Sequence, residues 1–383
     1  MQPVYLDHNA TTPLHPWARA AMLPWLAERW GNPSSRHAFG QAARGAVEEA
    51  REEVAALLGA RSPEVVFTAS GTEANNAVFE HVGARAGYRG QVVVSALEHP
   101  SVREGAARLA RRGMRVAVVS PGGDGIVPAA AVVEALAEDT RLVCLMLAHN
   151  ELGTLQPVAE LARACRERGV PVLCDAVQAA GKVPVDVGEL EIDYLTLGAH
   201  KLYGPLGAAA LWVRKGAELD GLLLGGGQER RRRAGTENVP ALVGLGAAAA
   251  AARAEGEARG ARLAALRDRF ECGLGRIPGA EVHCAGAPRL PNTSHVGFPG
   301  ADGEALFIRL DLSGFAVSTG AACASGAVEP SHTLLAAGFS REVALSSLRV
   351  SFGITNTEEE VDAFLDVLAR EVEEVRGLIG MID

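Results

Sequence analysis

The sequence predicts an α/β protein in which helices cover a mostly parallel central sheet and a second, smaller α/β domain follows. Three observations support this fold class. The chain has 383 residues, which is enough for more than one hydrophobic core. Short β-branched runs alternate with helical segments between about residues 64 and 213. Beyond residue 240, a long alanine-rich segment precedes shorter strand patterns that lie between helices.

Seven short runs predict the strands of the large sheet. In chain order they are EVVFTAS, QVVVSAL, MRVAVVS, RLVCLMLAHN, VPVLCDA, IDYLTLG and GAAALWV. Their alternation with helices is typical of a parallel sheet with both faces covered. Such sheets bind ligands at the carboxyl ends of their strands, so we expect functional residues directly after these runs.

The C-terminal part of the chain predicts a smaller unit of helices and short strands. The alanine-rich stretch to about residue 273 predicts one long helix, and AEVHCA, TSHVGF and LRVSFG predict strands. Thr357 and Glu360 have capping-box spacing, so a final helix starts there and buries one apolar stripe. We expect a large domain over residues 15–250. Residues 1–14 and 251–383 would form the small domain, which carries the loop around Cys323.

Composition indicates an ordinary globular protein. The net charge is −9, the apolar fraction is 48% and the charged fraction is 22%. This acidic balance argues against direct nucleic-acid binding. No apolar stretch approaches the length of a membrane span, and the first twenty residues contain no basic segment followed by an apolar run. We therefore expect a cytoplasmic protein without membrane contact.

Cysteine and lysine usage narrows the possible chemistry. The six cysteines form no CxxC pair, which predicts neither a disulfide scaffold nor a metal site and suits a reducing compartment. Lysine occurs only at Lys182, Lys201 and Lys215. If the protein uses lysine chemistry, it has few candidates.

Two threonine-bearing loops can hold an anion. Ser70 and Glu73 have capping-box spacing after the first strand, and the N-terminus of the helix that follows would face the strand end with Thr72. A simple helix cap explains this motif equally well. Thr236 lies in a second Gly-Thr-Glu triplet just before another predicted helix start.

A lysine and a carboxylate also follow predicted strands. Asp175 ends VPVLC, where a buried carboxylate needs a cationic or hydrogen-bonding partner. Lys201 closes the run IDYLTLG, where desolvation can free its amine to react with an aldehyde. Pyridoxal phosphate requires such a lysine, a carboxylate for its ring nitrogen and a phosphate cradle. All three have candidates here.

Further polar residues fit the same site. His99 follows QVVVSALE and could stack on a ring and move protons, although a turn or cap role is common for such a histidine. Arg349 lies in an otherwise apolar strand and needs an anion, which is either a substrate carboxylate or an internal acid. Asn150 follows another strand and could add a hydrogen bond.

One cysteine differs from the other five. Cys323 lies in a segment of small residues, as an accessible nucleophilic thiolate requires, whereas the others lie in strand or helix patterns. An incidental loop cysteine is the competing interpretation. The four arginines at 230–233 form either a solvated face or a partner contact, and could line the rim of the cofactor site.

The full set of motifs resembles the cysteine desulfurases of the class V aminotransferase group, which have the fold-type I architecture of pyridoxal phosphate-dependent transferases. The resemblance extends nearly from end to end. It rests on YLDHNATTP, GNPSS, the first Gly-Thr-Glu loop, EHPS, HNELG, DAVQ, AHKLYGP, GGGQERRRRAGTEN, the Cys323 loop and SSLRVSFG.

The resemblance implies a role for each cofactor residue. Lys201 would hold pyridoxal phosphate covalently, Asp175 would pair with the ring nitrogen and Gln178 would bond the ring hydroxyl. His99 would stack on the ring and relay protons. The phosphate would meet Thr72, His200 and, from the neighbouring subunit of a homodimer, Thr236.

The resemblance also implies the reaction. Asn150 and Arg349 would hold the carboxylate of L-cysteine. Cys323 would attack the substrate sulfur, release alanine and keep a persulfide for a sulfur-acceptor or iron–sulfur scaffold protein. The context SxGxACxS is similar to the branch that serves iron–sulfur assembly and thio-modification.

Four positions depart from the family pattern. Gly198-Ala199 stands where many relatives have Ser-Gly, which removes one hydroxyl from the phosphate site and predicts weaker cofactor binding. His149 and Leu206 also differ from common family residues, but neither has a proposed catalytic role.

Two alternatives remain open. The chain could be a selenocysteine lyase or a small-substrate aminotransferase of the same fold, in which Cys323 is incidental. It could also be a cofactor-free scaffold that binds partners through the arginines at 230–233.

Overall fold

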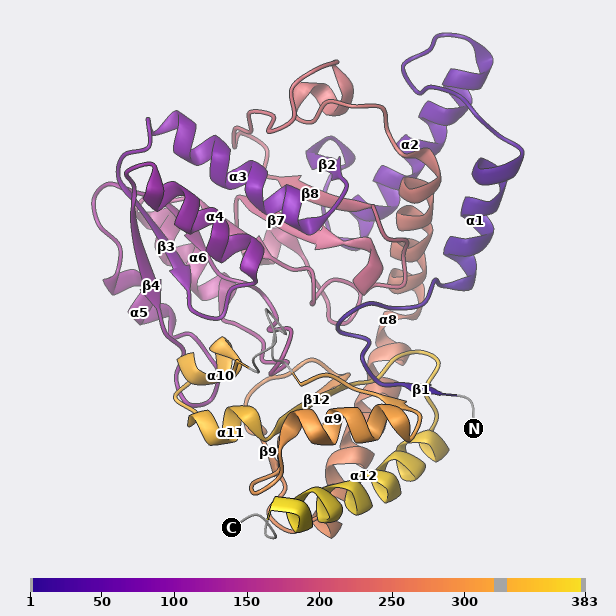
Figure 1. Cartoon of the computed structure of the whole chain (residues 1–383). Coiled ribbons are helices and arrows are strands. Elements are labelled where there is room, and N and C mark those ends of the chain that lie inside the picture. The colour runs from indigo at the N-terminus through magenta and orange to yellow at the C-terminus, as the bar shows by residue number, and fades with distance from the viewer. Residues whose placement is uncertain (1–2, 320–328, 380–383) are drawn as a thin grey trace.

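A large mixed sheet organises the upper part of the molecule in Figure 1, a computed structural model that describes residues 3–319 and 329–379. The strand order is β2-β8-β7-β6-β5-β3-β4. β8 is antiparallel to both β2 and β7, and the other neighbouring pairs are parallel. The strands are β2 (Val65–Thr68), β3 (Gln91–Ser95), β4 (Arg115–Val119), β5 (Thr140–Cys144), β6 (Val172–Asp175), β7 (Tyr194–Gly198) and β8 (Ala209–Val213). Every strand predicted for this sheet is present, which confirms the fold class.

Helices cover both faces of this sheet because side chains alternate along each strand. On β2, for example, Val65 and Phe67 belong to one apolar cluster and Val66 to another. The first cluster includes residues of α2 (Ala38–Leu57), α6 (Val158–Glu167) and α8 (Val239–Gly273). The second includes residues of α3 (Gly71–Arg85) and α4 (Pro100–Arg111). Both faces are therefore buried, as the near-continuous apolar runs predicted.

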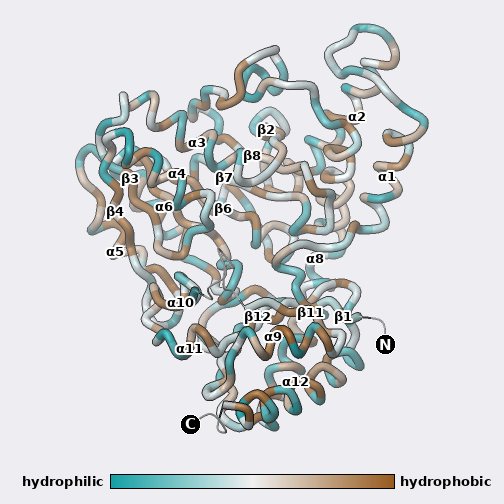
Figure 2. Tube along the Cα trace, viewed as in Figure 1, coloured by the Kyte–Doolittle hydropathy of each residue, from teal (hydrophilic) through white to brown (hydrophobic). Residues whose placement is uncertain are grey.

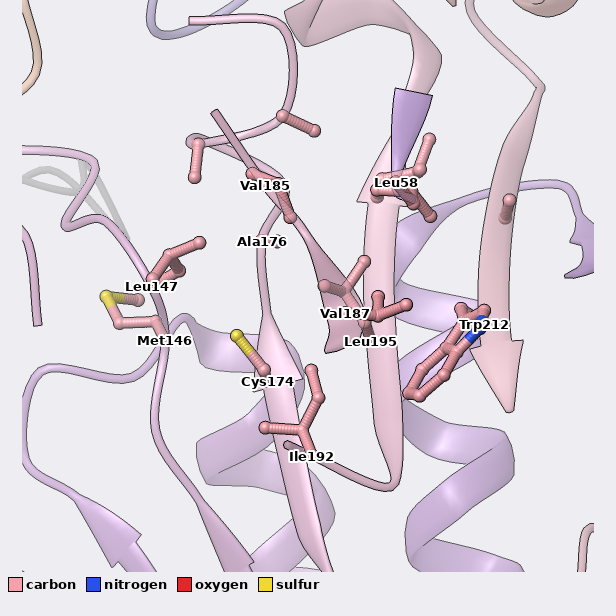
Figure 3. Close-up of a cluster of buried hydrophobic side chains, with 14 of the residues drawn as sticks. Leu58, Met146, Leu147, Cys174, Ala176, Val185, Val187, Ile192, Leu195 and Trp212 are labelled. Atoms are coloured by element: carbon pink, nitrogen blue, oxygen red, sulfur yellow. The ribbon is translucent and has the colours of Figure 1, made fainter. Parts of the chain in front are cut away.

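The larger cluster reaches the ends of the central strands. Figure 3 shows Cys174, Leu195 and Trp212 of β6, β7 and β8 packed in it. Met146 and Ala176, which lie just beyond β5 and β6, are buried in the same cluster. The backbone that follows these strands is therefore held by apolar packing, so polar side chains next to it have a rigid base.

A second apolar core fills the lower part of the molecule. Its three-stranded antiparallel sheet has the order β12-β10-β9, and β1 pairs in parallel with β11 nearby. These strands are β1 (Val4–Tyr5), β9 (Glu281–Val282), β10 (Thr293–Gly297), β11 (Phe315–Ala316) and β12 (Ser347–Ser351). The helices are α9 (Gly303–Leu312), α10 (His332–Ala336), α11 (Arg341–Leu345) and α12 (Glu358–Ile379).

Helix α12 begins and packs as the sequence predicts. Thr357 Oγ1 accepts from the Glu360 backbone N–H at 3.3 Å, and Glu360 Oε2 accepts from the Thr357 N–H at 3.1 Å. Hydrophilic and hydrophobic residues alternate along it in Figure 2. The predicted stripe is buried in the second core: Val361, Phe364, Leu365, Leu368, Val372 and Val375.

Helix α8 connects the two cores. Its first half packs in the core of the large sheet, and its second half, from Leu263 to Phe270, packs in the second core. The predicted domain boundary at residue 250 falls inside this continuous helix, so the division at that position stays a prediction. The remaining helices are α1 (Pro16–Ala27), α5 (Ala129–Glu134) and α7 (Val187–Leu190). None of the helices in residues 3–319 and 329–379 is long and apolar enough to cross a membrane.

Candidate active site

One cavity lies where strands of the large sheet end. Because β2, β3, β5, β6 and β7 all point the same way, the segments that follow them meet at one edge. The cavity has a volume of about 410 Å³, which is typical of small-molecule sites. Its lining includes these residues predicted from the sequence: Thr72, His99, Asn150, Asp175, Gln178, His200, Lys201 and Arg349.

Lys201 follows β7 in a short 3-10 turn, Ala199–Lys201. Its Nζ donates hydrogen bonds to the carbonyl oxygens of Asn9 and Ala10 at 2.5 and 2.6 Å. Burial, and after it the positive charge of Arg349, lower the pKa of this amine to about 8. A substantial fraction of the amine is therefore neutral near pH 7.5, and the neutral form is the one that attacks an aldehyde.

Asp175 is the last residue of β6, and its carboxylate accepts two hydrogen bonds. The Val177 N–H donates to Oδ1 at 3.0 Å, and Asn75 Nδ2 on α3 donates to Oδ2 at 2.9 Å. Asn75 Nδ2 also donates to Ser101 Oγ at 3.0 Å. Within the described ranges, no Lys, Arg or His forms an ion pair with this buried carboxylate. The site therefore suits a ligand that brings its own positive charge.

His99 caps the N-terminus of α4, and this contact defines its tautomer. The Ser101 backbone N–H donates to His99 Nδ1 at 3.2 Å, so Nδ1 carries no proton. The neutral ring then holds its proton on Nε2. Burial lowers the pKa of His99, while the charge of Asp175 opposes that shift. His99 can thus exchange a proton through Nε2.

The N-terminus of α3 forms one end of the cavity. Ser70 Oγ accepts from the Glu73 N–H at 3.1 Å, which confirms the predicted cap. A Cβ atom on Gly71 would lie only 2.9 Å from Val177 Cγ2, so glycine allows the helix start to approach the β6 loop closely. Thr72 lies in the first turn of this helix, whose positive dipole end favours an anion.

His200 lies on the same cavity. Its Nδ1 is 3.2 Å from Thr11 Oγ1. Burial, and after it the charges of Lys201 and Lys182, lower the pKa of its imidazole to about 4. His200 therefore offers a neutral hydrogen-bonding group to an anion.

Arg349 on β12 faces the cavity from the small core. Its Nη2 pairs with Asp7 Oδ1 at 2.5 Å, and its Nη1 donates to the Asn150 carbonyl at 3.0 Å. Its Nε is buried and has no hydrogen-bond partner in the described part of the chain. Both partners considered from the sequence are therefore compatible with the geometry. An internal acid occupies one side of the guanidinium, and the residue also lines the cavity, where a ligand anion could meet it.

Two predicted residues are not in this cavity. Thr236 lines a separate cavity with Thr68, Arg233 and Asn238, and the two cavities share no lining residue. One chain alone therefore does not bring Thr236 to the other site residues. Cys323 lies outside the described residues.

The described residues on either side of Cys323 are attached beside the cavity. Ser318 and Arg349 exchange backbone hydrogen bonds at 3.1 and 2.7 Å. Ser331 Oγ donates to Glu151 Oε2 at 2.5 Å, and Glu151 directly follows Asn150. Both flanks of the Cys323 segment thus contact residues next to the candidate site.

Four residues of the site were not singled out by the sequence analysis: Asp7, Asn9, Asn75 and Lys182. Asp7 and Asn9 belong to YLDHNATTP, which was used only as a family motif. Lys182 could have been examined as one of three lysines. Asn75 gives no local signal, because it lies inside a helix and reaches Asp175 only through the tertiary fold.

The described residues contain no group of three or more His, Cys, Asp or Glu side chains able to hold a metal ion. The cavity instead combines a reactive amine, an unpaired carboxylate, a helix N-terminus and a guanidinium. This combination of groups is the kind that an aldehyde-bearing cofactor held by a lysine would need.

Comparison with known proteins identifies the family. The sequence profile of the family described as aminotransferase class V matches residues 4–364. The chain therefore belongs to the class V aminotransferases, and its relatives place it among the cysteine desulfurases of that family.

Those relatives match over nearly the whole chain. A cysteine desulfurase of Gluconacetobacter diazotrophicus is 45% identical over 99% of this chain and 95% of its own. Cysteine desulfurase IscS of Dictyoglomus turgidum is 41% identical, over 98% of this chain and 96% of its own. Among solved structures, a NifS-like protein is 35% identical with a TM-score of 0.92, covering 97% of this chain and 100% of that one. SspA in complex with cysteine is 31% identical with a TM-score of 0.81, covering 91% and 98%.

Proposed function

We propose that this protein is a pyridoxal phosphate-dependent cysteine desulfurase. It converts L-cysteine to L-alanine and keeps the sulfur as a persulfide on Cys323. The observation that carries the proposal is the single cavity in which the Lys201 amine, the Asp175 carboxylate and the N-terminus of α3 face one another. The similarity to curated cysteine desulfurases over the full chain supports the choice of substrate.

The donor set of the cavity fits the cofactor. Lys201 would hold its aldehyde carbon, because this amine has a lowered pKa. Asp175 would hold the protonated ring nitrogen, because this buried carboxylate has no other ion-pair partner among the described residues. Thr72 and His200 would hold the phosphate near the N-terminus of α3. When bound, pyridoxal phosphate supplies a ring that takes up negative charge as a proton leaves the Cα atom of an amino acid.

Arg349 and Asn150 would orient the substrate through its carboxylate. Arg349 lines the cavity, so its guanidinium would give the carboxylate a charge-assisted hydrogen-bonding partner. His99 would then transfer protons at Nε2, because its Nδ1 is occupied by the Ser101 N–H. Asn75 fixes this arrangement by linking Ser101 to Asp175.

The sulfur transfer balances without an external oxidant. The Cys323 thiolate forms an S–S bond to the substrate sulfur, and the bond between that sulfur and the substrate β-carbon breaks. The β-carbon gains a proton and the electron pair of the broken bond, which makes it the methyl group of alanine. The Cys323 sulfur is oxidised to the persulfide. The attachment of both flanking segments to Arg349 and Glu151 supports access of this residue to the site.

The persulfide requires a protein that accepts sulfur, and iron–sulfur assembly or thio-cofactor and tRNA synthesis are the uses that fit.

A homodimer fits the geometry. Thr236 does not line the cavity of its own chain, so it would contact a cofactor phosphate only in the cavity of a second copy. The chain exposes large apolar side chains that a subunit interface could use, among them Trp17, Leu26, Trp30 and Leu224. The cytoplasm provides the reducing conditions that a reactive thiolate needs.

Mass spectrometry of the holoenzyme incubated with L-cysteine tests this function. We expect alanine in solution and one or more extra sulfur atoms on the peptide that contains Cys323. Cys323→Ser should keep the yellow cofactor but form no protein persulfide. A protein that releases alanine at the wild-type rate without Cys323 would instead favour the selenocysteine lyase or aminotransferase alternative. A wild-type protein that binds no cofactor would favour the scaffold alternative.

A further inference from the structure

Lys182 is a buried lysine that the proposed mechanism does not use. Lys182 is only 9% exposed. Its Nζ donates hydrogen bonds to Asn9 Oδ1 at 2.8 Å and to Gln178 Oε1 at 2.7 Å. No carboxylate pairs with it in the part of the chain that the structure describes. Burial lowers the pKa of Lys182 well below its usual value, and the charges of Lys201 and Arg349 lower it further. Both partners are side-chain amide oxygens, which can only accept, so the Lys182 amine donates in both contacts.

These contacts fix the direction of the Gln178 side-chain amide. Its Nε2 donates to the backbone oxygen of Asn9 at 2.8 Å, and that oxygen can only accept. Its Oε1 accepts from Lys182 on the other side. Reversal of the amide would lose both hydrogen bonds, so the nitrogen is held on the side of Asn9.

The same Asn9 oxygen also binds the Lys201 amine at 2.5 Å. Gln178 Nε2 and Lys201 Nζ therefore meet on one acceptor atom, and both residues line the cavity. An amide nitrogen carries two hydrogens, of which Asn9 uses one. The second Nε2 hydrogen is available next to the lysine that would hold the cofactor.

We propose that Lys182 is a positioning residue, which locks the Gln178 amide so that its free N–H faces the cofactor's ring hydroxyl oxygen beside Lys201. This inference rests on the proposed function, because it assumes pyridoxal phosphate at Lys201. It assigns Lys182 a task distinct from covalent attachment. Lys182 acts through Gln178 and does not contact the reacting atoms.

The expected consequence is spectroscopic. A donor to the ring oxygen competes with the proton on the nitrogen that links Lys201 to the cofactor, so it lowers the pKa of that nitrogen. Without Lys182 the amide keeps only its hydrogen bond to the Asn9 oxygen. It is then held less firmly, and its second N–H faces the ring oxygen for a smaller fraction of the time. A lost hydrogen bond to a charged group corresponds to a rise of about one pH unit in the midpoint of the visible absorbance titration.

The test titrates the visible absorbance of holoenzyme variants against pH. Lys182→Met removes both hydrogen bonds that the amine donates while keeping a side chain of similar length, and it should raise the midpoint by about one pH unit. Lys182→Gln keeps two N–H donors and should restore the midpoint most of the way to the wild-type value. Lys215→Met is the matched control, because Lys215 is exposed, and should leave the midpoint unchanged.

A double-mutant cycle tests whether Lys182 acts through Gln178. Gln178→Leu should raise the midpoint by itself, and Lys182→Met should add little in that background. If Lys182→Met does not fold, Lys182→Ala replaces it in the same titration. A wild-type midpoint in the Lys182 variant, or full additivity with Gln178→Leu, would overturn the proposal.

The controls separate this inference from the proposed function. If the wild-type protein shows neither bound cofactor colour nor a Cys323 persulfide, the proposed function itself fails. If the wild type shows both and the Lys182 variants titrate like it, only the positioning role of Lys182 fails.

Discussion

Competitive labelling of the cofactor-free protein with acetic anhydride would measure the pKa of the Lys201 amine, because only three lysines compete for the reagent. The structure lowers this pKa from 10.5 to about 8, first through burial and then through the charge of Arg349. At about pH 7.5, a pKa of about 8 leaves about a quarter of the amine neutral, whereas a pKa of 10.5 would leave about 0.1%. The structure thus predicts roughly a two-hundredfold larger population of the nucleophilic form.

The labelling rate of Lys201 is obtained from peptide masses at a series of pH values. Exposed Lys215 provides the internal reference for loss of reagent. We expect the Lys201 rate to rise with pH and to level off above its midpoint near the pKa of about 8. A rate that is still rising steeply at about pH 10 would refute the lowered pKa.

A variant separates the two causes of the shift. Arg349→Gln removes the nearby positive charge but leaves the burial of the amine, so the Lys201 midpoint should move upward without reaching the value of a free lysine. An unchanged midpoint in this variant would show that the guanidinium charge has no influence on the amine.

Three further perturbations test other parts of the site and its support. Asn75→Ala removes a hydrogen bond to the Asp175 carboxylate, which should weaken cofactor binding about ten- to hundredfold in equilibrium dialysis. Asn76→Ala is the control, and equal losses would contradict the role of Asn75. Burial raises the pKa of Glu98 to about 8, so the native carboxyl keeps a proton that the unfolded chain releases above its pKa of 4.5. Stability should therefore fall by roughly 3 kcal/mol between about pH 5 and 8, and denaturant unfolding of Glu98→Gln should show a flatter pH dependence. Glu229→Gln removes the buried carboxylate that pairs with Arg51 and leaves this guanidinium only its ion pair with the more exposed Glu48. It should cost up to about 3–5 kcal/mol in urea unfolding, whereas a loss below about 1 kcal/mol would show the Glu229 pair to be dispensable.

The large sheet could be predicted because each strand has its own local signal. The apolar runs and the helices between them determine burial on both faces of the sheet. Ser70 and Thr357 cap helix starts through hydrogen bonds to residues only three positions further along the chain. The strand β5 is shorter than its run, because the chain leaves the ladder after Cys144 while the next residues stay buried. Apolarity alone does not distinguish a strand from a buried loop.

The site was predictable where chemistry follows a strand end. Lys201, Asp175 and His99 are adjacent to runs that the sequence identifies, and parallel strands bring such positions together. Asn75 and Asp7 were not predictable in the same way. Asn75 reaches Asp175 across 100 positions of sequence, and Asp7 reaches Arg349 across 342, so their roles depend on tertiary contacts without local patterns.

Reduction of the holoenzyme with borohydride, followed by digestion and peptide mass spectrometry, tests the central claim most directly, since it fixes the cofactor to whichever lysine holds it. A pyridoxyl phosphate label on Lys201 is the predicted result. A label on Lys182 or Lys215, or no label on a protein that still releases alanine from cysteine, would contradict the assignment.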